Sequence, residues 1–173
     1  MIGRGKSKLM TDLIRFLQRH EGFRFLPYLC TANKNTVFYG RNIDDTGFNG
    51  DEILSLFKAI EIALDNCDDE TAQKIEDALL ETGMLALNND AEYAEAALQN
   101  IFHDMPIYTE NRRIALVSVM MNLGSSRFRG FKKMIQAVKE RNWTEAAIQL
   151  KDSKRHRQVT HRSNEEANLM EIG

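Results

Sequence analysis

Three residues near the N-terminus carry side chains that could together cleave a glycosidic bond. Cys30 and Thr36 follow Glu21 by nine and fifteen residues. Such cleavage needs a carboxylic acid that protonates the leaving oxygen and, on the opposite face of the sugar, a nucleophile or a group that holds the attacking water. Glu21 can supply the acid, and the other two can place the water. Residues of these types are common, so their surroundings must decide whether they form a site.

The segments around these residues are expected to form one helix and one hairpin. Apolar residues recur with helical spacing from Leu9 to Leu17, Ser7 can cap the start of that helix, and Gly22 can end it. Glu21 then lies in the last helical turn. Residues 36–39 are typical of a short strand. If the hairpin folds back over the helix, all three candidate side chains can face one cleft.

From residue 51 onward, the spacing of apolar residues predicts helices. They are expected at about 51–64, 72–83, 90–102, 109–124, 131–141, 144–150 and 163–172. The stretch 114–123 is apolar on nearly every side, which is typical of a helix at the centre of a domain. Many helices and one small hairpin predict a mostly helical α+β fold.

The composition is that of an ordinary globular domain. The chain has 173 residues, of which 43% are apolar and 28% charged. No apolar run approaches the roughly 20 residues that span a bilayer, and the N-terminus lacks the apolar stretch of a signal peptide. We therefore expect synthesis in the cytoplasm and no stable membrane association. Cys30 and Cys67 are expected to be separate thiols, with a disulfide as the alternative.

The net charge of −2 hides an asymmetry. Residues 49–83 carry ten acidic and two basic residues, a net of −8, whereas the rest of the chain has a net of +6. A positive body suits an anionic partner such as a cell wall or a nucleic acid. The basic run 151–162 lacks the interleaved aromatic residues that stack on bases, so no nucleic-acid partner is expected. The four histidines show no metal-ligand spacing, so neither a metal nor another cofactor is expected.

Three short motifs surround the candidate residues. They are Arg19-His20-Glu21-Gly22-Phe23, Pro27-Tyr28-Leu29-Cys30-Thr31 and Thr36-Val37-Phe38-Tyr39-Gly40-Arg41-Asn42. These motifs resemble those of the phage-type lysozymes, glycoside hydrolase family 24. The resemblance continues through 111–124, 131, 142–147 and 152–162, and in all it covers residues 9–48 and about 84–173.

The resemblance implies a two-lobed lysozyme-like fold, with a small N-terminal β-hairpin lobe, a helical lobe and the glycan between them. The chain would form a single domain over 1–173, with an acidic helical hairpin inserted at about 49–83. Glu21 would be the general acid of an inverting mechanism in which Cys30 and Thr36 place the attacking water. Arg162 is expected to pair with Glu21. The substrate contacts expected are Asn122, Arg162, Phe38 and Gly40.

The activity implied by the resemblance is that of a peptidoglycan muramidase, or endolysin. It would hydrolyse the β-1,4 bond between N-acetylmuramic acid and N-acetylglucosamine, act at the cell wall in the periplasm and serve host cell lysis. Release by a holin and a monomeric state are expected. The alternative is a lysozyme-fold protein that binds glycan or serves as an assembly module without cutting, and transglycosylation is left open beside hydrolysis.

The sequence departs from this family at three single positions. Phe38 stands where glycine is usual, Arg155 where an aromatic residue is common, and His161 where asparagine is usual. The bulky Phe38 is expected either to shift the hairpin or to line and narrow the cleft.

Each candidate residue also has an ordinary structural alternative. Glu21 could be a surface carboxylate at a helix end, Cys30 a small buried residue, Thr36 a strand residue and Arg162 a solvated charge. Trp143 is expected in the core. Because a thiol pKa is typically about 8.5, Cys30 is expected to be mostly neutral at pH 7, with a water-placing or electrostatic role and no nucleophilic attack.

Overall fold

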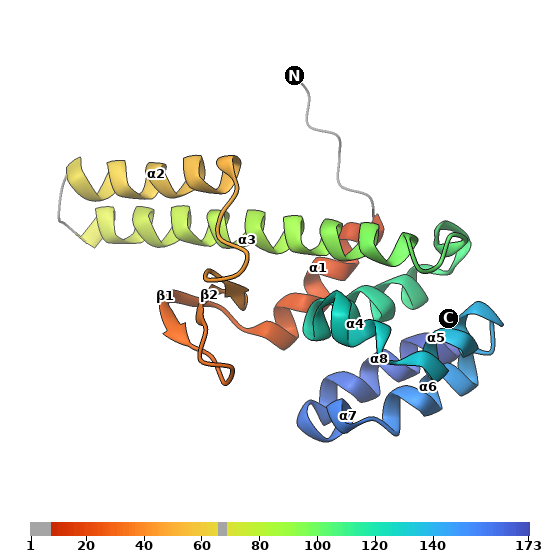
Figure 1. Cartoon of the computed structure of the whole chain (residues 1–173). Coiled ribbons are helices and arrows are strands. Elements are labelled where there is room, and N and C mark those ends of the chain that lie inside the picture. Colours follow the sequence, from red (N-terminus) through yellow and green to blue (C-terminus); the bar gives the residue numbers. More distant parts are fainter. Residues whose placement is uncertain (1–7, 66–68) are drawn as a thin grey trace. The chain divides into compact units, whose positions relative to one another are not determined.

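The computed structural model describes residues 8–65 and 69–173. The described chain is mostly helical with one small antiparallel sheet (Figure 1), so the predicted α+β class is confirmed. It divides into two compact units, unit 1 (Met1–Leu17 and Asp90–Gly173) and unit 2 (Gln18–Asn89). The predicted Ser7 cap and the alternatives for Cys67 lie outside the described residues. No helix in the described part of the chain combines the length and apolar character needed to cross a bilayer.

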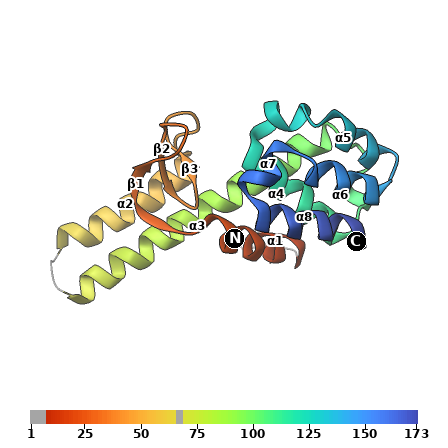
Figure 2. The same cartoon turned by 90° about the horizontal axis from the view of Figure 1, so that it is seen from below.

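Unit 2 contains the sheet, helix α2 (Gly50–Asp65) and most of helix α3 (Asp69–Gln99). The strands β1 (Arg24–Leu29), β2 (Asn35–Phe38) and β3 (Arg41–Asn42) pair in the order β1-β2-β3. The expected hairpin is therefore confirmed, and β3 extends it. Helices α2 and α3 lie side by side in unit 2 (Figure 2), where the Ser55 and Thr82 hydroxyls are 2.7 Å apart. They correspond to the predicted acidic helical hairpin, whose status as an insertion stays a prediction.

A buried ion pair ties the sheet to α2. Arg41 of β3 donates to the Glu52 carboxylate at 2.7 Å, and their side chains are 7% and 0% exposed. Arg41 also donates to the Gly47 carbonyl at 2.9 Å, and Asn89 of α3 donates to the second Glu52 oxygen at 2.8 Å. Removing one partner of such a pair costs about 3–5 kcal/mol, because the other charge is left buried. This contact therefore fixes the third strand of the sheet relative to both helices of the unit.

Helix α3 runs without a break where two helices were predicted at about 72–83 and 90–102. The predicted break at Gly83 was wrong, because that glycine serves packing instead of ending the helix. A Cβ at Gly83 would lie 2.5 Å from the Phe23 ring and 3.1 Å from Phe38. The absence of a side chain lets these two aromatic residues approach the helix backbone, which outweighs the cost of about 1 kcal/mol that glycine has inside a helix.

Unit 1 is entirely helical where it is described. Residues 8–17 of α1 (Lys8–Glu21) belong to it, together with residues 90–99 of α3. The other elements are η1 (Met105–Ile107), α4 (Glu110–Arg129), α5 (Lys132–Lys139), α6 (Trp143–Lys151), α7 (Lys154–Gln158) and α8 (Thr160–Ile172).

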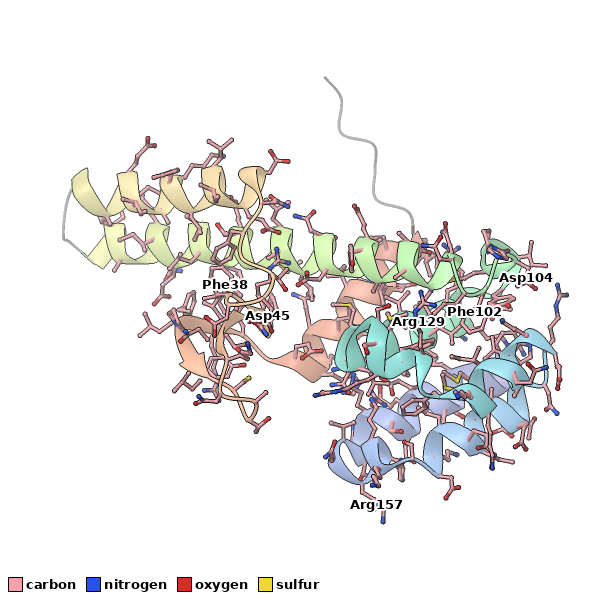
Figure 3. All side chains as sticks on the ribbon, in the orientation of Figure 1. Phe38, Asp45, Phe102, Asp104, Arg129 and Arg157 are labelled. Atoms are coloured by element: carbon pink, nitrogen blue, oxygen red, sulfur yellow. The ribbon has the colours of Figure 1, made fainter. Side chains whose placement is uncertain are left out.

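Helix α4 forms the centre of unit 1, as its apolar sequence predicted. Thr109 caps its start by accepting a hydrogen bond from the Arg112 backbone N–H, and Gly124, with φ of +74°, kinks it where its end was expected. Phe102, labelled in Figure 3, is buried beside it with its ring centroid 6.4 Å from that of Phe128. The short helix α7 was not predicted.

Candidate active site

Glu21 lies at the end of α1, where the chain turns toward the sheet. It is the last residue of the helix, which Gly22 ends with φ of +65°, as predicted. One turn earlier, the Gln18 side chain donates to the Tyr39 hydroxyl at 3.0 Å. This bond holds the last turn of α1 against the hairpin and so positions the half-buried Glu21 side chain.

Gly40 provides space beside the Glu21 carboxyl group. A Cβ built on Gly40 would lie 3.3 Å from Glu21 Oε2, and Gly40 has φ of +84°. The close approach and the left-handed backbone both disfavour a residue with a side chain at this position. The structure thus places Gly40, predicted as a substrate contact, directly beside the predicted acid.

Cys30 and Thr36 are brought together by the pairing of β1 with β2. Tyr28 lies opposite Thr36, and the turn that follows is closed by the Cys30 backbone N–H donating to the Lys34 carbonyl at 3.0 Å. The Thr36 hydroxyl lies 3.0 Å from that carbonyl and within hydrogen-bond reach of the Cys30 sulfur. Having a single proton, the hydroxyl donates to one of these acceptors at a time.

Hydrogen bonds in this turn change the chemistry of the thiol. The Lys34 backbone, followed by the Thr36 side chain, lowers the pKa of the Cys30 thiol because donors favour the thiolate. Cys30 is half-buried, so it is not a fully buried core residue, whereas Thr36 is buried in β2 and fits the strand alternative as well.

Two aspartates fix the turn of the hairpin to the chain that follows β3. Asp44 accepts hydrogen bonds from the backbone and the side chain of Asn35, both at 2.9 Å. Asp45, labelled in Figure 3, accepts from Lys34 and Asn42, also at 2.9 Å. The Asn35 side chain and backbone lower the pKa of Asp44, and the Lys34 side chain lowers that of Asp45. The aspartates thereby hold in place the turn that positions the thiol.

Phe38 is buried in unit 2 instead of lying on the hairpin surface. Phe38, labelled in Figure 3, is 3% exposed. Its ring stacks on Phe23 with centroids 5.7 Å apart, and the Phe48 ring lies at 6.1 Å. Its φ of +56° falls in the left-handed region, which costs a residue with a side chain about 1–2 kcal/mol. A glycine at this position would adopt that conformation freely. The predicted contact of Phe38 with substrate stays a prediction.

In unit 1, the predicted Asn122 and Arg162 belong to one hydrogen-bond network around the buried Glu166. The Glu166 carboxylate accepts two bonds from Arg155, at 2.6 and 2.9 Å, one from Arg162 at 3.1 Å and one from Ser118 at 2.6 Å. Arg155 Nε also donates to Asn122 Oδ1 at 2.6 Å. Arg162 is only 5% exposed, so the alternative of a solvated charge is wrong. Its predicted pairing with Glu21 joins residues of different units and stays a prediction.

Sequence analysis singled out neither Glu166 nor Ser118. One available signal was the spacing of Arg162 and Glu166, which places opposite charges one helical turn apart. A second was the arginine at 155 in place of the usual aromatic residue, because a buried arginine requires a carboxylate partner.

A hollow of about 760 Å³ opens on the surface of unit 1 beside this network. Leu123 and Arg155 are among its lining residues. The lining holds no acidic residue and five basic ones, Arg127, Lys132, Lys133, Lys154 and Arg155. A concave surface lined by one sign of charge raises the local concentration of ligands of the opposite sign, so this hollow suits an anionic ligand.

Known proteins show similarity over most of the chain. Residues 18–166 match the family described as phage lysozyme. "Probable T4-type lysozyme 2" of Dictyostelium discoideum is 33% identical over 78 residues, which is 45% of this chain and 44% of that relative. "Probable T4-type lysozyme 1" of the same organism is 23% identical over 168 residues, which is 95% of this chain and 96% of that relative. The match thus spans less than half of the first relative and nearly all of the second.

Proposed function

Since the chain belongs to the phage lysozyme family, we propose that it is a muramidase. It hydrolyses the β-1,4 bond between N-acetylmuramic acid and N-acetylglucosamine in peptidoglycan. The observation that best supports this proposal lies within unit 2, where a carboxyl group at a helix end stands beside Gly40 of a hairpin that also carries the paired Cys30 and Thr36. An inverting glycosidase needs these two kinds of group, an acid and a holder of water.

In the proposed reaction, protonated Glu21 gives its proton to the glycosidic oxygen as the carbon–oxygen bond breaks. The leaving sugar departs with a neutral hydroxyl group, and Glu21 is left as a carboxylate. A water molecule held by the Cys30 sulfur and the Thr36 hydroxyl attacks the anomeric carbon from the opposite face and releases its proton to the surrounding water. Exchange of a proton with solvent then restores Glu21 for the next cycle.

Unit 1 is assigned the binding of substrate. Asn122 contacts the glycan, and the basic hollow receives the carboxylates of the stem peptides that peptidoglycan carries. Contact of the buried Arg162 with the glycan stays a prediction. The basic lining of the hollow agrees with an anionic polymer as substrate. Host cell lysis, release by a holin, action in the periplasm and a monomeric state remain predictions from the family resemblance.

Digestion of purified peptidoglycan tests the proposal. Wild-type protein is compared with Glu21→Gln and with Glu92→Gln, a control on an exposed glutamate of α3. Wild type and the control should release fragments with new reducing ends, whereas Glu21→Gln should be slower by about a hundredfold or more, as is typical when a general acid is lost.

Other outcomes of this digestion would point elsewhere. Equal clearing by Glu21→Gln would remove Glu21 from the mechanism, and anhydro ends in the products would indicate transglycosylation. No clearing by wild type, with binding to the wall retained, would favour a glycan-binding module instead of an enzyme.

A further inference from the structure

The Asn122 side chain has one of its two polar atoms occupied by Arg155. Asn122 is exposed at the surface of unit 1, and its Oδ1 accepts a hydrogen bond from Arg155 Nε at 2.6 Å. A guanidinium group can only donate, so the carboxamide must turn its oxygen toward Arg155. The opposite atom, Nδ2, makes no hydrogen bond to any residue that the structure describes. The carboxamide therefore has one orientation, with Oδ1 toward Arg155 and the Nδ2 N–H donors available to a ligand.

Arg155 is itself held rigidly. Its two terminal nitrogens donate to the two oxygens of Glu166, at 2.6 and 2.9 Å, and these side chains are 4% and 0% exposed. All three nitrogens of the planar guanidinium are thus engaged, so the direction of Nε is determined by Glu166. Bidentate, charge-assisted bonds of this kind fix geometry more tightly than single neutral ones.

Stability alone does not account for this arrangement. A buried ion pair is often no more stabilising than well-packed apolar residues of similar volume. An apolar residue at position 155 could pack against unit 1 but could not bond Asn122 and Glu166 together. What the arginine adds is the orientation of a side chain at the surface.

We propose that Arg155 is a positioning residue that presents the Asn122 N–H donors to a carbonyl oxygen of the bound glycan. The acetamido groups of N-acetylglucosamine and N-acetylmuramic acid provide acceptors of this neutral kind. The inference rests on the proposed function, because it takes a peptidoglycan glycan as the ligand. Arg155 also lines the basic hollow, which places the residue it orients next to a concave surface.

Binding of a peptide-free tetrasaccharide of alternating N-acetylglucosamine and N-acetylmuramic acid, measured by calorimetry in the Glu21→Gln background, tests the proposal without turnover. Asn122→Asp keeps an oxygen for Arg155 but cannot donate, so its Kd should rise about tenfold, as for the loss of one good hydrogen bond. Arg155→Lys keeps the charge but cannot bond Glu166 and Asn122 together, and its Kd should rise about fivefold. The double variant Asn122→Ala/Arg155→Lys should have the same Kd as Asn122→Ala alone, because both changes remove the same contact with the glycan.

The matched control is Arg157→Lys, the same substitution two residues away on α7. Arg157 is exposed and points into solvent (Figure 3), so the Kd of Arg157→Lys for the tetrasaccharide should equal that of the parent protein. Thermal unfolding checks each variant, and Arg155→Met replaces Arg155→Lys if the latter does not fold. In amide NMR spectra, the Asn122 side-chain resonances should shift in Arg155→Lys and not in Arg157→Lys.

Three results would overturn the inference: unchanged affinity of Asn122→Asp, unchanged affinity of Arg155→Lys, or losses that multiply in the double variant. If the parent protein binds the tetrasaccharide and Arg155→Lys binds it equally well, only the positioning role fails. If the parent protein itself does not bind the tetrasaccharide, the proposed function fails, and the inference fails with it.

Discussion

Substitution of Gly40 would test how the hairpin places Glu21. Gly40→Ala forces alanine into a backbone conformation with φ of +84°, and it brings a carbon atom within 3.3 Å of Glu21 Oε2. The first change acts on stability and the second on the position of the carboxyl group. Gly47→Ala is the matched control, because Gly47 has φ of +64° but its Cβ would lie 4.0 Å from its nearest neighbour, the Ile43 carbonyl oxygen.

The size of each effect follows from these geometries. A left-handed residue with a side chain costs about 1–2 kcal/mol, which for a chain of this length lowers Tm by roughly 2–8 °C. Both variants should show this loss. In Gly40→Ala the carboxyl group must also move by a few tenths of an ångström. Since a displacement of about 1 Å can cost about a hundredfold in rate, this smaller one should lower kcat about three- to tenfold.

Circular dichroism gives Tm, and release of reducing ends from purified peptidoglycan, well below the lower Tm, gives kcat. We expect similar Tm values for the two variants and a lower kcat for Gly40→Ala alone. A wild-type kcat for Gly40→Ala would refute the reasoning that Gly40 positions the acid. An equal loss of kcat in Gly47→Ala would show that hairpin strain, and not the contact with Glu21, limits activity.

Further predictions concern the hairpin. Phe38→Gly should relieve about 1–2 kcal/mol of backbone strain but remove a buried ring worth about 3–5 kcal/mol. The free energy of unfolding in urea should therefore fall by about 1–4 kcal/mol, and a more stable variant would show that strain dominates. Because backbone hydrogen bonds lower the pKa of the Cys30 thiol, labelling of Cys30 by iodoacetamide in a Cys67→Ser variant should reach its midpoint at a lower pH than labelling of a free cysteine in the same buffer. An equal midpoint would contradict the geometry. Asp44 and Asp45 have lowered pKa values, so their contribution to stability is present above the unfolded value of about 3.9 and is lost as pH falls through the folded values. The free energy of unfolding should therefore fall more on acidification in wild type than in the double variant Asp44→Asn/Asp45→Asn. Equal dependence of this free energy on pH in the two proteins would show that the two aspartates do not stabilise the hairpin turn.

Features with a local signal in the sequence could be predicted. Gly22 and Gly124 interrupt their helices with positive φ, and Thr109 caps α4, because each acts on the backbone of its own turn. Gly83 is also a glycine in a helical pattern, but it does not end the helix. It is needed because a side chain there would collide with the Phe23 ring from a distant segment. A contact between distant segments of this kind leaves no periodic pattern in the sequence, so the helix end predicted at Gly83 was wrong.

The site divides in the same way. Glu21, Cys30 and Thr36 could be singled out as candidates from short motifs, because one helix end and one hairpin carry them all. The link between Arg155 and Glu166 could not, since a buried charge is understood only when its partner is known.

The shared carboxylate of Glu166 restricts the mutational path by which this network can arise. With Arg162 and Glu166 in place, an aromatic residue at 155 still leaves the carboxylate paired with Arg162. With Arg155 present and an apolar residue at 166, the new guanidinium is buried without its carboxylate, at a cost of several kcal/mol. Of the two single-residue routes to this pair, the one that gains the acid first therefore avoids the costly intermediate.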